Sequence, residues 1–319
     1  MSNNIQILAG AEEGSARLDS FLAKKLASQS RTRIKTLIEQ GMVLVNGKPA
    51  KPSAQIKPGD RIEIVIPAPA PARPVAEAIP LQVLYEDKDV IVIDKPAGLM
   101  THPAPGRFSG TLVNALLYHC RDLSGIGGEL KPGIVHRLDK LTSGVMVAAK
   151  NDLAHRNLSE QFKEHSIERA YWALVWGNPP GDSGRIETMI GRNPHHRLKM
   201  TAAMGKGRLA ITEWKVVKRF KHFSLIECRL HTGRTHQIRV HLTEMGYPLV
   251  GDALYGRGRG VSEKFNPQVK AAVKNLNRQA LHAFKLGFDH PAGGKRMTFN
   301  SPLPDEIGVL IKLLEKFDR

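Results

Sequence analysis

The chain has 319 residues, enough for roughly two domains with buried cores. Its 47 lysines and arginines against 30 aspartates and glutamates give a formal net charge of +17, which favours an anionic partner such as nucleic acid over a small neutral metabolite. A hydrophobic content of 41% argues against a disordered chain, no apolar run reaches the about 18 residues of a membrane helix, and two cysteines cannot build a disulfide framework. The first residues also lack the basic and apolar regions of a signal peptide, so we expect a cytoplasmic protein without a membrane partner.

The first part of the chain predicts a small domain of two helices followed by β-structure, which we place at residues 1–66. Apolar residues at helical spacing predict one helix near its start and a second that is capped by Ser30 and ends at Gly41. Alternating valines then lead into Asn46-Gly47, a strong hairpin signal, and isoleucines alternate again over residues 62–66.

Three basic residues, Arg31, Arg33 and Lys35, crowd the start of the second helix, where backbone N–H groups also favour phosphate. They are candidate RNA contacts, and a solvated basic face is the alternative. The stretches RLDSFLAKKLASQSRTRIKTLIEQGMVLVNG and IKPGDRIEI resemble, over about residues 15–65, the αL-type RNA-binding domain of many proteins that act on rRNA or tRNA. The resemblance implies RNA as the partner of this domain.

Residues 67–80 form a segment in which prolines alternate mainly with alanines. This composition favours an extended, semi-rigid linker over a packed element. The alternative is an ordered strap that lies on the following domain, because proline-rich connectors are sometimes pinned by contacts.

Residues 81–319 predict a larger α+β domain. Its helical periodicity is confined to residues 153–165, 234–245 and 307–317. Strands are predicted for the stretches VIVIDKP, GVMVAAK, AYWALVWG and FSLIECRL. Because strands and helices do not alternate regularly, we expect a mixed or antiparallel sheet and not a parallel βαβ fold.

The most unusual polar cluster is His136, Arg137, Asp139 and Lys140, which lies between two apolar runs in GIVHRLDKLTSGVMVAAK, residues 133–150. Turn-forming residues flank it, so we expect Asp139 on a loop at the edge of the sheet. A neighbouring cation favours the ionised carboxylate. For an isolated Arg-x-Asp pattern, a structural ion pair is the alternative interpretation.

The pattern HRLD followed by Thr-Ser-Gly resembles the catalytic motif of the RluA family of pseudouridine synthases. By this resemblance, Asp139 is the residue that attacks the target uridine, Tyr171 in ERAYWALVWG is the active-site tyrosine, and Arg239 in LHTGRTHQIRVHL pairs with the catalytic carboxylate. Lys95-Pro96-Ala97-Gly98 resembles the upstream motif of the family. The resemblance runs from about residue 80 to the end, and it implies the mixed-sheet fold of these enzymes.

One position departs from the family pattern. Leu141 stands where many relatives carry an acidic residue, which leaves the attacking carboxylate untouched and changes at most the solvation beside it.

The resemblance implies that the protein isomerises specific uridines in the 23S rRNA of the large subunit to pseudouridine, as a monomer active in ribosome biogenesis. The reaction breaks the glycosidic C–N bond and rejoins the base through C5 without net redox change, so no cofactor is required. The carboxylate attacks either C1′ of the sugar or C6 of the base. Because a stacked uracil is out of reach, the nucleotide must flip into the pocket, with Arg137 as a wedge or phosphate contact. Arg234 is a further candidate RNA contact, near a predicted helix start.

Several alternatives stay open on the sequence alone. The substrate is a tRNA, or the chain is a non-catalytic RNA-binding assembly factor on the same fold, or it is a hydrolase that uses a carboxylate nucleophile on small substrates. The histidines of residues 231–241 raise the question of a metal, but no cysteine or carboxylate is spaced to complete a set of about four ligands, so we expect none. We interpret RNPHHRLK as part of a basic, RNA-facing loop, and residues 256–260 as a mobile basic loop that lacks the strand and helix context of a nucleotide-binding fingerprint.

Overall fold

The structure, a computed structural model, describes residues 3–10, 16–26, 29–66, 74–104, 108–120, 123, 132–202, 207–256, 258, 260 and 265–318. The chain divides into two compact units, Met1–Ala72 and Arg73–Arg319. The division falls inside the segment in which we expected a linker.

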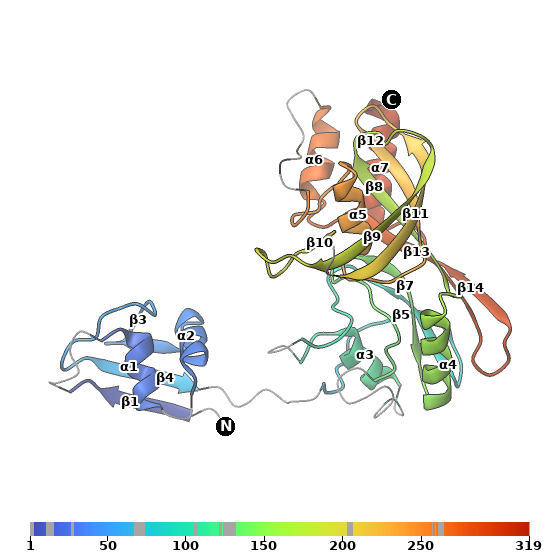
Figure 1. Ribbon diagram of the computed structural model, residues 1–319. Helices are drawn as coiled ribbons and strands as arrows, with labels where there is room; N and C mark the ends of the chain where they lie inside the picture. The colour runs from blue at the N-terminus through green and yellow to red at the C-terminus, as the bar shows by residue number, and fades with distance from the viewer. Residues whose placement is uncertain are drawn as a thin grey trace. The chain divides into compact units, whose positions relative to one another are not determined.

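The first unit is a four-stranded antiparallel sheet with two helices (Figure 1). The strand order is β1-β4-β2-β3. In chain order the elements are β1 (Asn3–Leu8), α1 (Leu18–Lys25), α2 (Arg31–Glu39), β2 (Val43–Val45), β3 (Lys48–Pro49) and β4 (Arg61–Ile66).

The local signals of this unit act as predicted. The Ser30 hydroxyl accepts the N–H of Arg33 at 3.2 Å and caps α2. Asn46 and Gly47 take φ values of 52° and 75°, the left-handed pair that a two-residue hairpin turn requires between β2 and β3. The sequence did not reveal β1, which pairs with β4 along its whole length. The helices and the sheet share one apolar core, formed by Leu18, Phe21, Leu22, Ile34, Leu37, Ile38, Val43, Ile62 and Ile64 among others.

The second unit is built on one large mixed sheet (Figure 1). Its strand order is β10-β9-β11-β12-β8-β13-β7-β6-β5, and β14 pairs with β13. The strands are β5 (Gln82–Glu86), β6 (Val90–Lys95), β7 (Ser143–Ala149), β8 (Glu168–Trp176), β9 (Ser183–Arg192), β10 (Met200–Ala202), β11 (Arg208–Arg219), β12 (Phe223–Leu230), β13 (Leu281–Asp289) and β14 (Arg296–Asn300).

The pairing of β13 with β7 makes the sheet mixed. These two strands run parallel, with His282 opposite Ser143, whereas the other strand pairs of the described residues are antiparallel. Strand β13 therefore joins a half made of β5 to β7 to a half made of β8 to β12. The α+β fold with a mixed sheet is confirmed.

Five helices accompany this sheet within the described residues: α3 (Leu112–His119), α4 (Asp152–Lys163), α5 (Gln237–Glu244), α6 (Pro267–Asn275) and α7 (Asp305–Phe317). The predictions of α4, α5 and α7 are confirmed. Helix α3 escaped prediction because its first five residues are all buried, which leaves no one-sided apolar pattern. Among the helices of the described residues, none combines the length and apolar character needed to cross a membrane.

Part of the proline-rich segment is pinned to the second unit. The N–H of Glu77 donates to the carbonyl of Asn114 at 3.0 Å, and the Glu77 carboxylate accepts the N–H of Gly110 at 3.0 Å. The Asn114 side chain in turn donates to the carbonyl of Val75 at 2.8 Å. These contacts match the strap alternative for this stretch, whereas residues 67–73 of the expected linker lie outside the described residues.

Candidate active site

A cavity of about 520 Å³ in the second unit brings together segments that are far apart in the sequence. Its wall comes from the loop before β7, the end of α4, strand β8, the turn before α5 and the first residues of α5. Its size lies within the range of pockets that hold small organic groups. The lining residues with functional side chains include His102, Arg137, Asp139, Lys163, His165, Arg169, Tyr171, Arg234, His236 and Arg239.

Asp139 lies on the loop before β7, as the turn residues predict, and this loop is fixed from several sides. Thr101 donates its hydroxyl to the carbonyl of Leu138 at 2.9 Å, and the N–H of Gly98 donates to the carbonyl of Lys140 at 2.8 Å. The N–H of Thr142 closes a turn onto the carbonyl of Asp139 at 3.0 Å. The backbone that carries the carboxylate is therefore preorganised.

Lys95 of the KPAG motif lies under the same loop and is fully buried. Its ammonium group donates to the carbonyls of Pro96 at 2.8 Å, Leu99 at 2.9 Å and Lys140 at 3.3 Å. Burial lowers the pKa of Lys95 to about 7, and the Asp139 charge opposes that shift. The motif thus ties the end of β6 to the loop that carries the candidate nucleophile.

Arg239 of α5 connects two carboxylates. Its Nη1 lies 2.9 Å from Oδ2 of Asp139, while its Nε and Nη2 make a two-pronged contact with Asp252 at 2.7 and 2.9 Å. The side chain of Asp252 is 1% exposed and also accepts the N–H groups of Leu254 and Tyr255. Asp252 therefore holds the guanidinium in place, and a planar fork held on one side presents its other donor in a fixed direction to Asp139.

Tyr171 lies on β8 and borders the cavity with only 7% of its surface exposed. Burial raises the pKa of its hydroxyl, the Arg169 charge opposes this shift, and the Asp139 charge adds to it. The hydroxyl is therefore protonated at neutral pH. The structure thus places Asp139, Tyr171 and Arg239, the three catalytic candidates of the sequence, around one cavity.

His236 and Tyr255 were not anticipated as site residues. His236 adopts a left-handed backbone with a φ of 57°, which is uncommon for a residue other than glycine and is typical of functional sites. Its Nε2 lies 3.8 Å from Oδ2 of Asp139, and its Nδ1 shares a hydrogen bond of 2.8 Å with the Tyr255 hydroxyl. The Tyr255 ring also stacks under the Arg239 guanidinium, 4.9 Å from its centre. Tyr255 therefore supports two side chains that face Asp139.

The turn before α5 is fixed by Gln237. Its Oε1 accepts the Thr232 hydroxyl at 2.7 Å and the N–H of Arg234 at 2.9 Å, and its amide group donates to the carbonyl of Ile211 at 2.9 Å. Helix α5 begins at Gln237, three residues later than predicted, because residues 234–236 form this turn.

The candidate RNA contacts divide between the two units. Arg137 and Arg234 line the cavity, where Arg137 contacts His102 at 3.2 Å and Arg234 donates to the carbonyl of Leu209 at 2.9 Å. In the first unit, α2 carries the other three. Arg31 pairs with Asp19 at 3.1 Å, Lys35 lies 3.7 Å from Glu39, and Arg33 is exposed.

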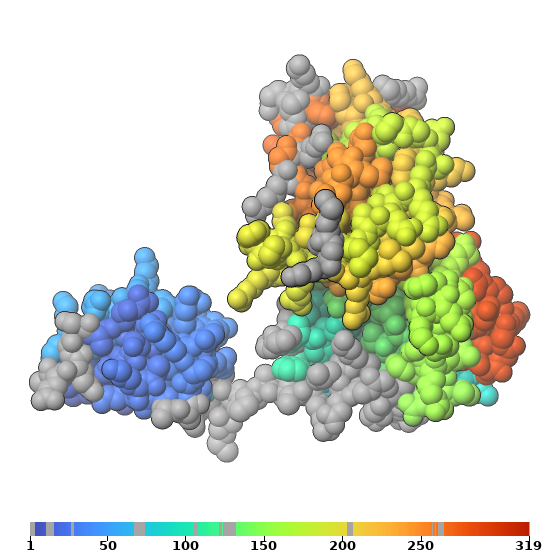
Figure 2. All heavy atoms as spheres, in the orientation of Figure 1, coloured from blue at the N-terminus to red at the C-terminus, as the bar shows by residue number. Residues whose placement is uncertain are grey.

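Leu141, the departure from the family pattern, is 36% exposed. Its carbonyl accepts a hydrogen bond from Arg278 at 3.1 Å, and Leu141 is not among the residues that line the cavity. The predicted basic loop RNPHHRLK joins β9 to β10 and extends from the body of the second unit (Figure 2). Of the other predicted loop, Arg257 and Arg259 lie outside the described residues.

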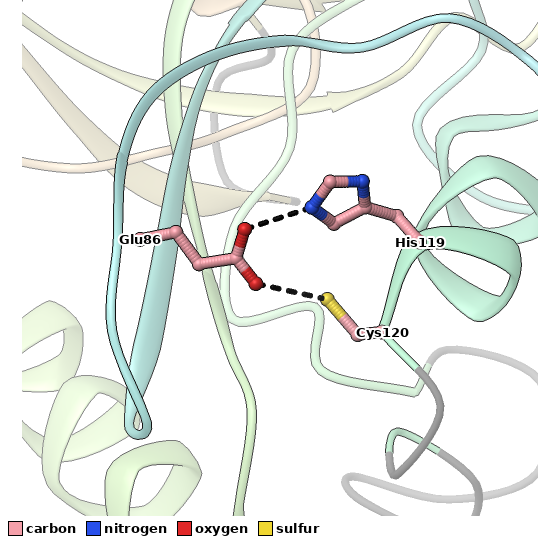
Figure 3. Close-up of side chains that lie close together, drawn as sticks. All are labelled: Glu86, His119 and Cys120. Atoms are coloured by element: carbon pink, nitrogen blue, oxygen red, sulfur yellow. Dashed lines mark hydrogen bonds and ion pairs between the residues drawn. The ribbon is translucent and has the colours of Figure 1, made fainter.

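The histidines of residues 231–241 have separate partners. His231 pairs with Glu213 at 2.9 Å, His236 with Tyr255, and His241 with two threonine hydroxyls, so the three rings do not converge. A group of mixed donors lies elsewhere, where the Glu86 carboxylate contacts His119 at 2.8 Å and Cys120 at 3.9 Å (Figure 3). Because Lys150 already neutralises that carboxylate at 2.7 Å, we assign it no metal.

Comparisons with known proteins identify the family of the chain. The RNA pseudouridylate synthase family matches residues 89–244, and the S4 domain, an RNA-binding module, matches residues 16–62. An RNA pseudouridine synthase of Bacillus subtilis is 44% identical over 314 residues, which cover 98% of this chain and 99% of that protein. The ribosomal large subunit pseudouridine synthase D of Neisseria meningitidis is 46% identical over 98% of this chain and 82% of its own length. The chain belongs to the RNA pseudouridine synthase family.

The solved structures support the fold. The human RNA pseudouridylate synthase domain containing 4 has a TM-score of 0.55 and 25% identity, with coverage of 75% of this chain and 94% of that one. The human domain containing 1 has a TM-score of 0.54 at 24% identity and covers 75% of this chain and 96% of that one. Its family makes the protein an isomerase that acts on RNA, and its first unit contains an S4 domain.

Proposed function

We propose that this enzyme converts specific uridines of the large-subunit 23S rRNA into pseudouridine, with Asp139 as the nucleophile on a flipped-out nucleotide. The contact of 2.9 Å between Asp139 and Arg239, inside a cavity that also contains Tyr171, carries the proposal. The rRNA substrate is supported by the names of close relatives, three of which are ribosomal large subunit pseudouridine synthases D at 45 to 46% identity.

The geometry suits an attacking carboxylate. The Asp139 side chain is 17% exposed, so little water competes for it, and Nη1 of Arg239 lies 2.9 Å from its Oδ2. Only one of its oxygens contacts Arg239, which leaves the other for the nucleotide. Attack at C1′ of the sugar or at C6 of the base begins from this same ionised group.

The role we assign to Tyr171 is to hold the freed base. After the C1′–N1 bond breaks, the uracil must turn before C5 bonds to C1′, and an aromatic wall keeps it in the cavity without fixing one orientation. Because the Tyr171 hydroxyl is protonated, it can donate a hydrogen bond to the base. It can take part in proton transfer only if a second group accepts its proton. Loss of the proton from C5 and gain of one at N1 complete an isomerisation that needs no cofactor.

The test is turnover of rRNA fragments and tRNA transcripts by the wild-type enzyme and by Asp139→Asn. We expect the variant to lose pseudouridine formation by at least about 10⁴-fold and to bind RNA with an affinity close to that of the wild type, because amide and carboxylate have the same shape. Asp182→Asn, at a site 90% exposed, is the matched control and keeps full activity. Turnover by Asp139→Asn would rule out the proposed nucleophile. A wild-type enzyme that binds rRNA but modifies only tRNA would show that the substrate is tRNA and would contradict the proposed rRNA substrate.

A further inference from the structure

Arg169 is a buried cation for which the described residues offer no counter-ion. It lies on β8 two positions before Tyr171, and both side chains border the cavity. The residue is 7% exposed, and no carboxylate of the described residues lies within ion-pair distance of it. By contrast, the buried Arg239 pairs with Asp252 and Asp139, and the buried Arg278 pairs with Glu306.

The hydrogen bonds of Arg169 are also incomplete. Its Nη2 donates to the carbonyls of Leu230 and His231, each at a long 3.3 Å, and its buried Nε has no partner. The ring of Phe162, 5.5 Å from the guanidinium, offers a cation–π contact. An unpaired buried charge with an orphaned donor is costly in a folded protein, so such an arrangement points to a ligand that supplies the missing acceptor.

The surroundings of Arg169 are positive. The cavity lining contains five lysines and arginines, namely Arg137, Lys163, Arg169, Arg234 and Arg239, against the single acid Asp139. Burial lowers the pKa of His165, and the charges of Arg169 and Arg234 lower it further. Gly233 leaves room beside the guanidinium, because a Cβ at that position would lie 3.0 Å from Nη1 of Arg169.

From these contacts we propose that Arg169 forms a phosphate subsite, which binds a backbone phosphate of the RNA next to the flipped-out uridine. The inference rests on the proposed function, since the ligand must share the cavity with the nucleotide at Asp139 and Tyr171. Phosphodiesters are the anionic groups of RNA, and the planar fork of arginine fits two phosphate oxygens. The subsite would fix the backbone while the base turns.

The first test compares Arg169→Met and Arg169→Lys with the wild type in RNA affinity over a series of salt concentrations. We expect Arg169→Met to bind RNA at least about tenfold more weakly than the wild type. The slope of log affinity against log salt concentration should become shallower by about one, the amount expected for one lost phosphate contact. Arg169→Lys, which keeps the charge but not the fork, restores part of the affinity. Arg229→Gln, on the neighbouring β12 and paired with Glu227 at 2.7 Å, is the matched control for loss of one arginine and binds as the wild type does.

Thermal unfolding of the free protein separates this role from a structural one. Because the guanidinium is unpaired without RNA, we expect Arg169→Met to keep or raise the Tm while it weakens RNA binding. A structural arginine would give a lowered Tm instead, and that result, or wild-type affinity with an unchanged salt dependence, would overturn the proposal.

A second test identifies the phosphate. RNA hairpins that carry one uncharged methylphosphonate linkage, on the 5′ or the 3′ side of the target uridine, are bound by the wild type and by Arg169→Met. At the contacted linkage, we expect the two changes to be strongly non-additive, so that the variant loses no further affinity there. Additive losses at both linkages would contradict the subsite. These experiments measure binding and need no turnover. If the enzyme bound rRNA without modifying it, the proposed function would be refuted, but the binding data would still test the phosphate subsite at Arg169.

Discussion

At the scale of single residues, the site depends on a chain of ionic contacts that ends at Asp139. Asp252 is buried and holds Nε and Nη2 of Arg239, so its role is to fix this guanidinium, and Nη1 of Arg239 then faces the candidate nucleophile. This order matters because a displacement of about 1 Å in a reacting group can cost about 10²-fold in rate. Tyr255 also supports the site, because its ring stacks on the Arg239 guanidinium and its hydroxyl shares a hydrogen bond with His236.

His136 gives the stability of the fold a dependence on pH. Its Nε2 accepts the N–H of Val147 at 3.1 Å, and its ring stacks on Phe162 with centres 4.6 Å apart. Burial, and next the Arg169 charge, lower the pKa of His136 from 6.5 to about 3. Between pH 6.5 and 3, His136 is therefore protonated in the unfolded chain but neutral in the folded chain. The stability that this residue contributes above pH 6.5 is lost as the pH falls toward 3.

We predict that His136→Gln flattens the acid side of the stability profile. In wild type, this residue adds a slope that approaches about 1.4 kcal/mol per pH unit in the middle of its window, and glutamine keeps an acceptor for Val147 without titrating. Urea unfolding at a series of pH values between 4 and 7 measures the slope, and the exposed His195→Gln serves as a control with the wild-type profile. Equal slopes for all three proteins would show that His136 is not the titrating group.

At the scale of elements, the loop that carries Asp139 is held by a close approach of two strands. Gly144, at the start of β7, has a φ of 121°, and a Cβ there would overlap the carbonyl oxygen of Ala283 on β13. Only glycine permits this conformation and this approach. The parallel pairing of β7 with β13, and with it the position of the preceding loop, depends on that absence of a side chain.

Gly144→Ala should therefore destabilise the second unit by at least about 3 kcal/mol, because strand separation and a strained backbone act together. The free energy of unfolding in urea is the measurement. Gly293→Ala, in the hairpin between β13 and β14, meets no atom within 4 Å and should stay within about 0.5 kcal/mol of the wild type. A comparable stability for the two variants would contradict the proposed role of this contact.

The elements also show where prediction from the sequence succeeds and where it stops. Asp139, Tyr171 and Arg239 stand in recognisable motifs, and the strands that carry or flank them have clear β patterns. Asp252, Tyr255 and Arg169 escaped attention because their roles depend on partners that only the folded sheet brings near. Helix α3 was missed for a local reason, since a helix buried on many sides loses its amphipathic signal.

At the scale of the whole molecule, a formal charge of +17 and two units with separate cores suggest a division of labour. The second unit contains the cavity, whereas the S4 domain presents basic residues on α2. Arg31 is engaged by the buried Asp19 at 3.1 Å, whereas Lys35 has only a longer contact of 3.7 Å with the exposed Glu39. Arg33 and Lys35 are therefore the better candidates for direct RNA contact. Such contacts raise affinity for the phosphate backbone without touching the chemistry.

We predict that the double variant Arg33→Gln and Lys35→Gln binds rRNA several-fold more weakly, with a smaller salt dependence, and keeps the wild-type rate at saturating RNA. A matched pair, Lys312→Gln and Lys316→Gln on α7, removes the same charge from a helix that does not line the cavity and should change affinity less. If the two double variants weakened RNA binding equally, α2 would contribute only through the net charge of the protein, and a direct contact of Arg33 and Lys35 with RNA would be contradicted.

Pseudouridine mapping across total RNA tests the central claim most directly. Cells without the gene are compared with cells that carry the wild-type gene or Asp139→Asn. We predict that specific pseudouridines in the large-subunit rRNA vanish on deletion, return with the wild-type gene and stay absent with Asp139→Asn. Sites that persist without the gene, or that return with the asparagine variant, would contradict an enzyme whose chemistry depends on this carboxylate.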